Sequence, residues 1–217
     1  TKAAYARNMV TGFIKLNGMT VGAVANCAKA YDADGKLAEE FDGTLTARGC
    51  NKAAEFVNFC DAFSIPVLSI TNVTGLHACM CSERNLAKAL ARLTVAFVNA
   101  TVPKVNLITG KAFGSAYMFM NSKSIGADVV YAWKDAEIGT MDAKLAAEIL
   151  YPEAKGDELE TKAGEFRKLQ LNVESAAARG QVDRIIEPSD SRKFVVAAME
   201  LLYTKSSSTP VKKHGTK

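Results

Sequence analysis

Apolar residues recur along this chain in two patterns, short continuous runs and one-sided helical stripes. Continuous runs typical of strands buried on both faces occupy residues 67–71, 104–109 and 128–133. Apolar positions at helical spacing predict helices over residues 49–63 and 83–100. Strand and helix therefore alternate, which predicts an α/β fold with helices packed on a largely parallel sheet.

The N-terminal segment has the periodicity of strands. Two apolar runs within residues 12–26 flank Asn17-Gly18, a dipeptide that favours a two-residue hairpin turn. Residues 31–43 are acidic and rich in turn formers, so we expect an exposed excursion there. The D-A-D-G run in this excursion resembles part of a calcium loop, but the rest of the ligand spacing does not follow, so no calcium site is predicted.

The last third of the chain is predicted to be mostly helical. An apolar stripe over residues 157–179 ends at Gly180, a residue typical of helix C-caps. Residues 181–188 read as a short extended link, and a second stripe predicts a helix over residues 192–203. The two stripes favour packing into the core or against another subunit.

The strongest candidate site lies around the motif GKAFGSAY. Gly110 and Gly114 interrupt the exit of a buried strand, and small residues then open a short helix predicted at about residues 115–122. The first amides of a helix have no intrahelical partner, so they can donate hydrogen bonds to an oxyanion. The loops after two neighbouring strands, residues 72–81 and 110–115, lie where such folds usually bind ligands. A helix start that is only packed tightly on the sheet explains the same residues equally well.

Composition bounds the protein without assigning a function. The 217 residues suit one domain, which we place over residues 1–205, followed by a flexible tail or linker over residues 206–217. The net charge of +4, with lysines spread out until the tail, predicts no nucleic-acid interface. No apolar run approaches the roughly 20 residues of a membrane span. An odd number of cysteines, five, with no export signal favours a cytoplasmic setting, and a chain that begins at Thr1 reads as an excerpt or a processed piece.

Familiar catalytic motifs are absent from the sequence. His77, Cys79 and Cys81 form the one arrangement that suggests a metal, but a fourth ligand is missing because His214 lies in the polar tail, so no metal is predicted. The chain has no G-x-S-x-G, Walker or G-x-G-x-x-G motif. With His77 as the single candidate, acid–base catalysis by histidine is not expected. Stabilisation of an enolate-like oxygen by backbone amides remains possible for such a chain.

Five blocks of sequence resemble the C-terminal half of the carboxyltransferase component of biotin-dependent acyl-CoA carboxylases and decarboxylases. The blocks follow the order of that family, cover almost the whole chain, and occupy residues 12–26, 53–68, 100–133, 136–143 and 180–202. The resemblance implies a crotonase-like fold, in which ββα units wind into the superhelix of the ClpP/crotonase class with helices at the subunit contact.

The resemblance also implies a function. In that family the C-terminal half receives carboxybiotin, the N-terminal half holds the acyl-CoA, and the active site forms where the two kinds of half meet across a dimer. The implied catalytic groups are the backbone amides of Ser115 and Ala116, which would hold the ureido oxygen of biotin as the carboxyl group leaves. The implied biotin-binding residues are Gly75, Leu76, Gly114 and Tyr117.

Cofactors and partners follow from the same resemblance. The chain contains no A-M-K-M-like biotin attachment site, so biotin would arrive on a separate carrier domain or subunit, with an acyl-CoA as the substrate. The implied partners are the N-terminal carboxyltransferase half, a biotinyl carrier protein, a biotin carboxylase and further copies in a homo-oligomer. We expect the chain to be inactive by itself. Its sequence leaves open which acyl-CoA is used.

The chain departs from the family at two places that bear on the site. Many members have two glycines where this chain has Gly114-Ser115, and many read D-V-P-G-F where residues 72–76 read N-V-T-G-L, which indicates a variant subgroup. Two alternatives stay open: a noncatalytic assembly or binding module of a crotonase-fold complex, and a subunit of a biotin-dependent acyl-CoA decarboxylase. A stand-alone enoyl-CoA hydratase-like enzyme is disfavoured because no suitable acidic residue accompanies the GSAY segment.

Overall fold

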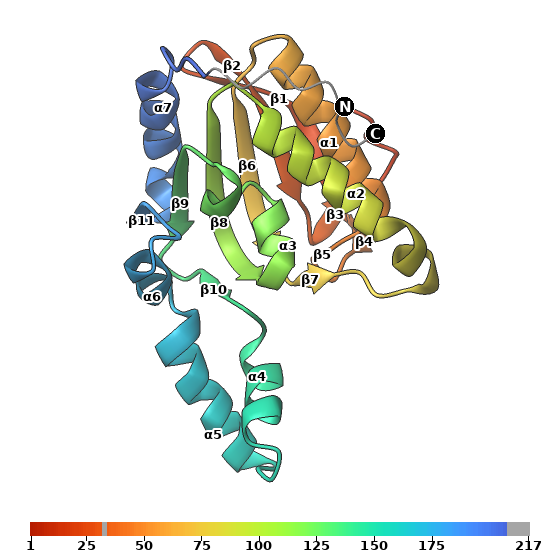
Figure 1. The fold of residues 1–217 in the computed structure, drawn as a ribbon, viewed down its shortest axis with the longest axis vertical. Coiled ribbons are helices and arrows are strands. Elements are labelled where there is room, and N and C mark those ends of the chain that lie inside the picture. Colours follow the sequence, from red (N-terminus) through yellow and green to blue (C-terminus); the bar gives the residue numbers. More distant parts are fainter. Residues whose placement is uncertain (32–33, 208–217) are drawn as a thin grey trace.

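A computed structural model describes residues 1–31 and 34–207, and its centre is one twisted sheet (Figure 1). The strand order is β1-β2-β6-β8-β9-β11, and β10 (Glu137–Gly139) pairs with the end of β8. Only the pair β1·β2 is antiparallel among these pairings, which confirms the predicted largely parallel sheet. The strands of the main order are β1 (Met9–Leu16), β2 (Met19–Asn26), β6 (Val67–Val73), β8 (Lys104–Phe113), β9 (Val129–Trp133) and β11 (Arg184–Ile186).

The predicted hairpin at the N-terminus is confirmed. Leu16 pairs with Met19, so Asn17 and Gly18 form the whole turn between β1 and β2. Both turn residues have positive φ, 49° and 82°, as a primed two-residue turn requires. This turn sets the register that brings Val21 and Val24 of β2 into the core, where both are fully buried.

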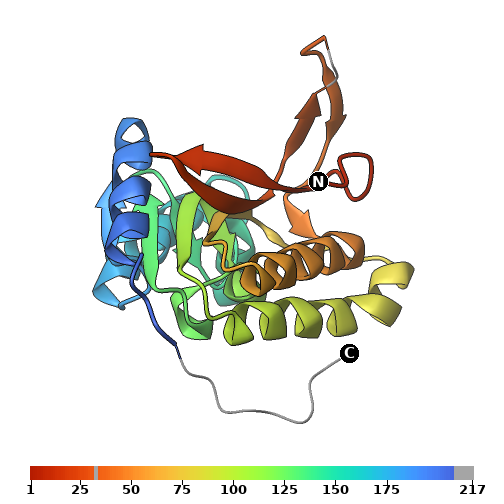
Figure 2. The same ribbon diagram turned by 90° about the horizontal axis from the view of Figure 1, so that it is seen from above.

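Helices cover both faces of the sheet (Figure 2). On one face, α1 (Ala47–Ala62) packs beside α2 (Met80–Asn99), and their apolar stripes close the main core. On the other face, α7 (Ser191–Leu201) places Val195, Ala198 and Met199 against the sheet. The predicted helices over 49–63, 83–100 and 192–203 are therefore confirmed with shifted ends. No helix in the described part of the chain is long and apolar enough to cross a membrane.

The predicted exposed excursion contains a small two-stranded ribbon. Strands β3 (Lys29–Tyr31) and β4 (Leu37–Glu40) pair antiparallel and project from the body (Figure 2). Residues 32–33 of the D-A-D-G run lie outside the described residues. After the ribbon, β5 (Thr44–Leu45) pairs in parallel with β7 (Gly75–Leu76), which adds a second short strand between β6 and α2. The order β6-β7-α2 and β9-β10-α4 repeats a strand–strand–helix unit, where α4 is Ala143–Leu150.

The prediction of one helix over residues 157–179 is wrong. Two helices, α5 (Asp157–Phe166) and α6 (Val173–Ala178), are separated by a π-helical turn, η2 (Arg167–Leu171), and by Asn172 in an extended conformation. The side chain of Asn172 accepts from the Ser175 amide at 2.6 Å and so starts a new helix. This N-cap gives an acceptor to an amide that the break in the helix leaves without an intrahelical partner.

The predicted extended link over residues 181–188 is extended at its centre, but the sequence did not predict that it joins the sheet. Its central residues form β11, which pairs in parallel with β9 and closes one edge of the sheet. Two short 3₁₀ turns complete the elements, η1 (Lys123–Ile125) and η3 (Pro188–Asp190). A three-residue strand is too short to show strand periodicity, so its pairing depends on the neighbouring strand.

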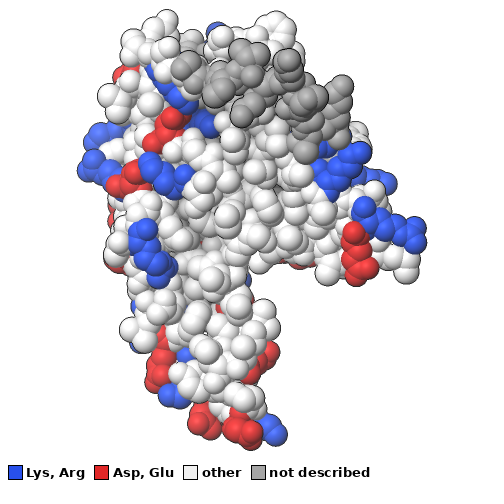
Figure 3. All heavy atoms as spheres, in the orientation of Figure 1, with Lys and Arg blue, Asp and Glu red and all other residues white. Residues whose placement is uncertain are grey.

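A helical arm projects from the body of the molecule (Figure 1). We define the helical arm as residues 143–171, which comprise α4, α5 and η2. Its tip carries acidic and basic side chains, and a hollow separates it from the body (Figure 3). The arm is attached through a small apolar cluster that includes Phe113, Ala147, Ala163 and the fully buried Leu171.

The end of the described chain is anchored at Lys205. Its ammonium group donates to the Asp128 carboxylate at 2.8 Å and to the Val102 carbonyl at 3.0 Å. This contact agrees with a domain over residues 1–205, although that boundary stays a prediction. Most of the tail predicted over residues 206–217 lies outside the described residues.

Candidate functional site

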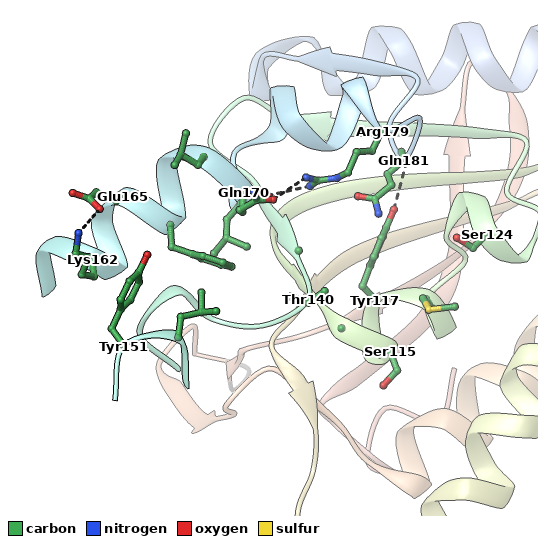
Figure 4. Close-up of a pocket in the computed structure, with 17 residues that line it drawn as sticks. Ser115, Tyr117, Ser124, Thr140, Tyr151, Lys162, Glu165, Gln170, Arg179 and Gln181 are labelled. Atoms are coloured by element: carbon green, nitrogen blue, oxygen red, sulfur yellow. Dashed lines mark hydrogen bonds and ion pairs between the residues drawn. The ribbon is translucent and has the colours of Figure 1, made fainter. Parts of the chain in front are cut away.

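A cleft of about 840 Å³ lies between the short helix α3 (Gly114–Phe119) and the helical arm (Figure 4). One wall is formed by the start of α3 and by β10, and the opposite wall is formed by α5 and η2. The lining residues are Gly114, Ser115, Tyr117, Met118, Ser124, Gly139, Thr140, Leu150, Tyr151, Lys162, Glu165, Phe166, Leu169, Gln170, Leu171, Arg179 and Gln181. The cleft thus joins the predicted GSAY segment to parts of the chain that the sequence did not connect with it.

Gly114 makes the sharp passage from β8 into α3. Its φ is +59°, a conformation that side chains with a Cβ rarely adopt. A Cβ at this position would also lie 2.9 Å from the carbonyl oxygen of Thr140, on the loop after β10. Both constraints require glycine at this position. The next residue, Ser115, is exposed and lines the cleft.

The start of α3 has no side-chain cap. Phe113 occupies the N-cap position, and its side chain has no oxygen with which to cap the first turn. The amides of Ser115 and Ala116 fall in this first turn, where no intrahelical acceptor exists. The Ser115 side chain lies at the cleft, whereas the Ala116 side chain is buried in the main core. The first turn of α3 therefore faces the cleft on the side of Ser115 and packs against the core on the side of Ala116.

Tyr117 forms part of the floor of the cleft. Its ring is almost fully buried, and its hydroxyl donates to the backbone carbonyl of Gln181 at 3.5 Å (Figure 4). Burial, together with the nearby carboxylate of Asp183, raises the pKa of Tyr117 to about 12. The phenol is therefore neutral at physiological pH and cannot serve as a general base there.

Gly75 and Leu76 lie beside the cleft rather than in its lining. Both form β7, which packs next to α3 and is held in place by its pairing with β5. Both are half-buried. Four of the predicted residues, Gly114, Ser115, Ala116 and Tyr117, therefore belong to α3 itself. The other two lie on the neighbouring strand β7, outside the lining of the cleft.

The sequence analysis missed the far wall of the cleft. The Lys162 ammonium lies 5.3 Å from the ring centre of Tyr151 and 3.2 Å from the Glu165 carboxylate (Figure 4). The hydrogen bond to Glu165 raises the pKa of Lys162. The expectation of one helix over residues 157–179 gave no reason to place these residues near α3. The available signal was Asn172, a preferred N-cap residue inside the apolar stripe.

His77, Cys79 and Cys81 do not assemble a metal site. The Nδ1 atom of His77 faces the Asp42 carboxylate at 3.8 Å, and the Cys79 thiol accepts from the Ser82 amide at 3.3 Å. Hydrogen bonding with the Ser82 side chain and amide lowers the pKa of Cys79, which is the N-cap of α2. Within residues 1–31 and 34–207, no group of three or more His, Cys, Asp or Glu side chains is placed to hold a metal ion.

Substitution of Gly114 by alanine tests the requirement at the entry to α3. We expect the free energy of unfolding to fall by about 1–3 kcal/mol, because alanine must adopt positive φ and also displace the Thr140 carbonyl. Urea denaturation measures the change. The control is Gly164→Ala in α5, where a Cβ meets nothing within 4 Å and helix propensity predicts a gain of about 0.5–1 kcal/mol. Equal effects at the two glycines would contradict the constraint.

Comparison with known proteins places this geometry in a family. The model of the carboxyl transferase domain matches residues 1–216. The chain is 38% identical to the methylmalonyl-CoA carboxyltransferase 12S subunit of Propionibacterium freudenreichii subsp. shermanii, over 99% of this chain and 40% of that protein. It is 40% identical to the mitochondrial propionyl-CoA carboxylase beta chain of Homo sapiens, over 97% of this chain and 37% of that protein.

Solved structures give the same result for the fold. A crystal structure of transcarboxylase 12S, with methylmalonyl-coenzyme A and methylmalonic acid bound, matches 99% of this chain and 40% of that chain at 38% identity, with a TM-score of 0.89. The beta subunit of geranyl-CoA carboxylase from P. aeruginosa matches at 23% identity with a TM-score of 0.78 and supports the fold alone. These matches confirm the predicted crotonase-like fold. The chain spans about 40% of the length of these relatives.

Proposed function

The chain belongs to the carboxyl transferase family, and from this membership we propose that it is the biotin-side, C-terminal half of an acyl-CoA carboxyltransferase. The observation that carries the proposal is the open, uncapped start of α3 at a cleft large enough for a small ring system. The length match also supports it, because the chain spans well under half of relatives named for carboxyl transfer to or from acyl-CoA.

In the proposed mechanism, the amides of Ser115 and Ala116 donate hydrogen bonds to the ureido oxygen of biotin. When bound, carboxybiotin supplies the carboxyl group that is transferred. The two backbone donors at the start of α3 would hold the ureido oxygen and would stabilise negative charge on it. Because these donors are part of the main chain, they are held by the fold and need no reorientation during the reaction.

The surroundings of α3 suit this role. Tyr117 presents a neutral ring, since its raised pKa of about 12 keeps the phenol protonated. A lining cation, Lys162 of the helical arm, is already paired with Glu165. A ring bound at Ser115 would therefore meet backbone donors and apolar surface, and the lining carboxylate of Glu165 is paired with Lys162. In this proposal no side chain of the α3 segment would act as the general base, since Tyr117 is held neutral.

The proposal assigns the remaining functions to partners. A biotinyl carrier protein would deliver biotin, an N-terminal carboxyltransferase half would hold the acyl-CoA, and a biotin carboxylase would load the carrier. Transcarboxylase 12S assembles as a hexamer, which supports a homo-oligomer for this chain as well. The names of the relatives favour propionyl-CoA or methylmalonyl-CoA as the acyl group.

A second candidate function is assembly without catalysis. It is favoured by the exposed apolar side chains of the helical arm, which are Leu145, Ile149, Leu150 and Leu169. Such a surface is typical of protein contacts. A subunit of a biotin-dependent acyl-CoA decarboxylase would use the same α3 geometry in the opposite direction.

Titration of the chain with free biotin at millimolar concentration, followed by NMR of the backbone amides, tests the proposal. We expect the largest shifts at Ser115 and Ala116, because their hydrogens would bond to the ureido oxygen. The amide of Ser175 is a matched control, since it starts α6 but already donates to Asn172 at 2.6 Å. An absence of shifts over α3 at saturating biotin would contradict the biotin-side role and favour the assembly module.

A further inference from the structure

Four polar side chains are buried together beneath α3. We call Ser69, Thr71, Asn106 and Asn121 the interior polar cluster; each has no exposed surface. Ser69 and Thr71 belong to β6, Asn106 belongs to β8, and Asn121 follows α3. Nothing in the proposed reaction uses these side chains directly, and their positions in the centre of a parallel sheet are ones that apolar residues usually occupy.

Hydrogen bonds connect the interior polar cluster to the end of α3. The Thr71 hydroxyl lies 2.8 Å from the Asn106 Oδ1 and 3.4 Å from the carbonyl oxygen of Met120. The Ser69 hydroxyl lies 3.1 Å from the same Oδ1, and the Asn121 amide donates to Ser69 at 3.0 Å. The cluster therefore ties two adjacent strands to the residues at which α3 ends.

Stability alone does not account for this arrangement. The Nδ2 atom of Asn106 and the Oδ1 atom of Asn121 are buried without a protein partner. Rotating either carboxamide by half a turn exchanges an unpaired donor for an unpaired acceptor, so the deficit persists. A buried polar group without a partner opposes folding, and valine or leucine would fill the same space without this cost. The geometry points to a positional role instead.

The positional role concerns α3, which is too short to be stable without contacts to the rest of the fold. Helix α3 has six residues, and isolated helices of this length are unstable. Its start is held where Gly114 passes close to Thr140, and its end is held where Met120 and Asn121, the latter at φ +56°, turn the chain back over the sheet. Between these two points the helix carries the Ser115 and Ala116 amides.

We propose that the interior polar cluster, through the Thr71 hydroxyl, sets the position of α3 on the sheet and thereby the direction of the Ser115 and Ala116 amides. Thr71 is then a positioning residue, not a catalytic one. The inference rests on the proposed function for its effect on turnover, but its effect on α3 is independent of that function. Small displacements of donors that bind a developing charge reduce rate far more than binding.

The matched pair Thr71→Val and Thr71→Ser tests the inference, with exchange measured on the whole chain and kcat on the complex reconstituted with an N-terminal carboxyltransferase half. Valine has the shape of threonine without the hydroxyl, whereas serine retains the hydroxyl. In Thr71→Val we expect amide hydrogen exchange over residues 114–120 to accelerate and kcat to fall about tenfold, with KM for the carboxylated carrier unchanged. In Thr71→Ser we expect exchange and kcat close to wild type.

Thr11→Val is the control for a lost buried hydroxyl elsewhere. Thr11 lies on the edge strand β1 and is 4% exposed. Its hydroxyl bonds to the Thr1 hydroxyl, and β2 separates β1 from the strand β6 that carries Thr71. It should leave exchange over α3 and kcat unchanged. Wild-type exchange over α3 in Thr71→Val, or equal acceleration in all elements with kcat unchanged, would overturn the inference. The biotin titration tests the proposed function independently of Thr71, because it monitors the Ser115 and Ala116 amides in the unsubstituted chain.

Discussion

Replacing Ser115 by proline is expected to lower kcat of the complex reconstituted with an N-terminal carboxyltransferase half about 10²–10³-fold. Proline lacks the backbone N–H, so the substitution removes one of the two proposed donors to the ureido oxygen. The fold should persist, because proline has the φ of a first helical turn and position 115 makes no capping bond. Steady-state carboxyl transfer from a carboxylated biotinyl carrier measures the effect, and circular dichroism checks the fold.

Ser115→Ala is the matched control for this substitution. It removes the hydroxyl and keeps the amide, so the proposed mechanism requires turnover near wild type. If proline and alanine had the same effect, the backbone donor would have no role and the serine side chain would be the active group. Full activity in a folded Ser115→Pro protein would instead favour the noncatalytic assembly module.

Truncation of Leu171 to alanine should produce the largest loss of stability among these changes. Leu171 has no exposed surface and joins the helical arm to Phe113, the N-cap residue of α3. It packs so closely on β10 that a Cβ at Gly139 would lie 2.2 Å from its Cδ2. Leucine-to-alanine changes at such sites cost about 2–5 kcal/mol. We expect the cost to fall mainly on the arm, as faster amide exchange over residues 143–171.

Leu169→Ala is the control for Leu171→Ala, because it makes the same substitution at an exposed position. Leu169 lies two positions earlier in the same π-helical turn and is 69% exposed. Its truncation should change the free energy of unfolding by less than about 0.5 kcal/mol. A cost at Leu169 equal to that at Leu171 would mean that the arm is held by its own helices rather than by the contact with Gly139.

Much of the central fold could be predicted from local patterns. The dipeptide Asn17-Gly18 specifies its turn because both residues tolerate positive φ, and the apolar runs within β6, β8 and β9 specify buried strands. The stripes of α1 and α2 specify which faces meet, since their spacing matches one helical period. These signals are local, so a single sequence contains them in full.

The errors arose where a tertiary contact decided between local options. The stripe over residues 157–179 favours one helix, but the burial of Leu171 against Gly139 and the cap at Asn172 divide it. Residues 184–186 form a strand only because β9 offers an unpaired edge. The contact of Leu171 with Gly139 and the pairing of β11 with β9 involve partners remote in sequence, whereas the cap at Asn172 is a local signal.

For the site, the sequence by itself determined the start of α3. Gly114 gives the turn, small residues permit close approach, and an uncapped first turn gives amides that can bind an oxyanion. Only the tertiary structure decided that the helical arm forms the opposite wall, that Tyr117 is buried and neutral, and that Gly75 and Leu76 lie behind the helix. The reason is physical: backbone geometry follows from neighbouring residues, whereas enclosure and pKa depend on which distant surfaces exclude water.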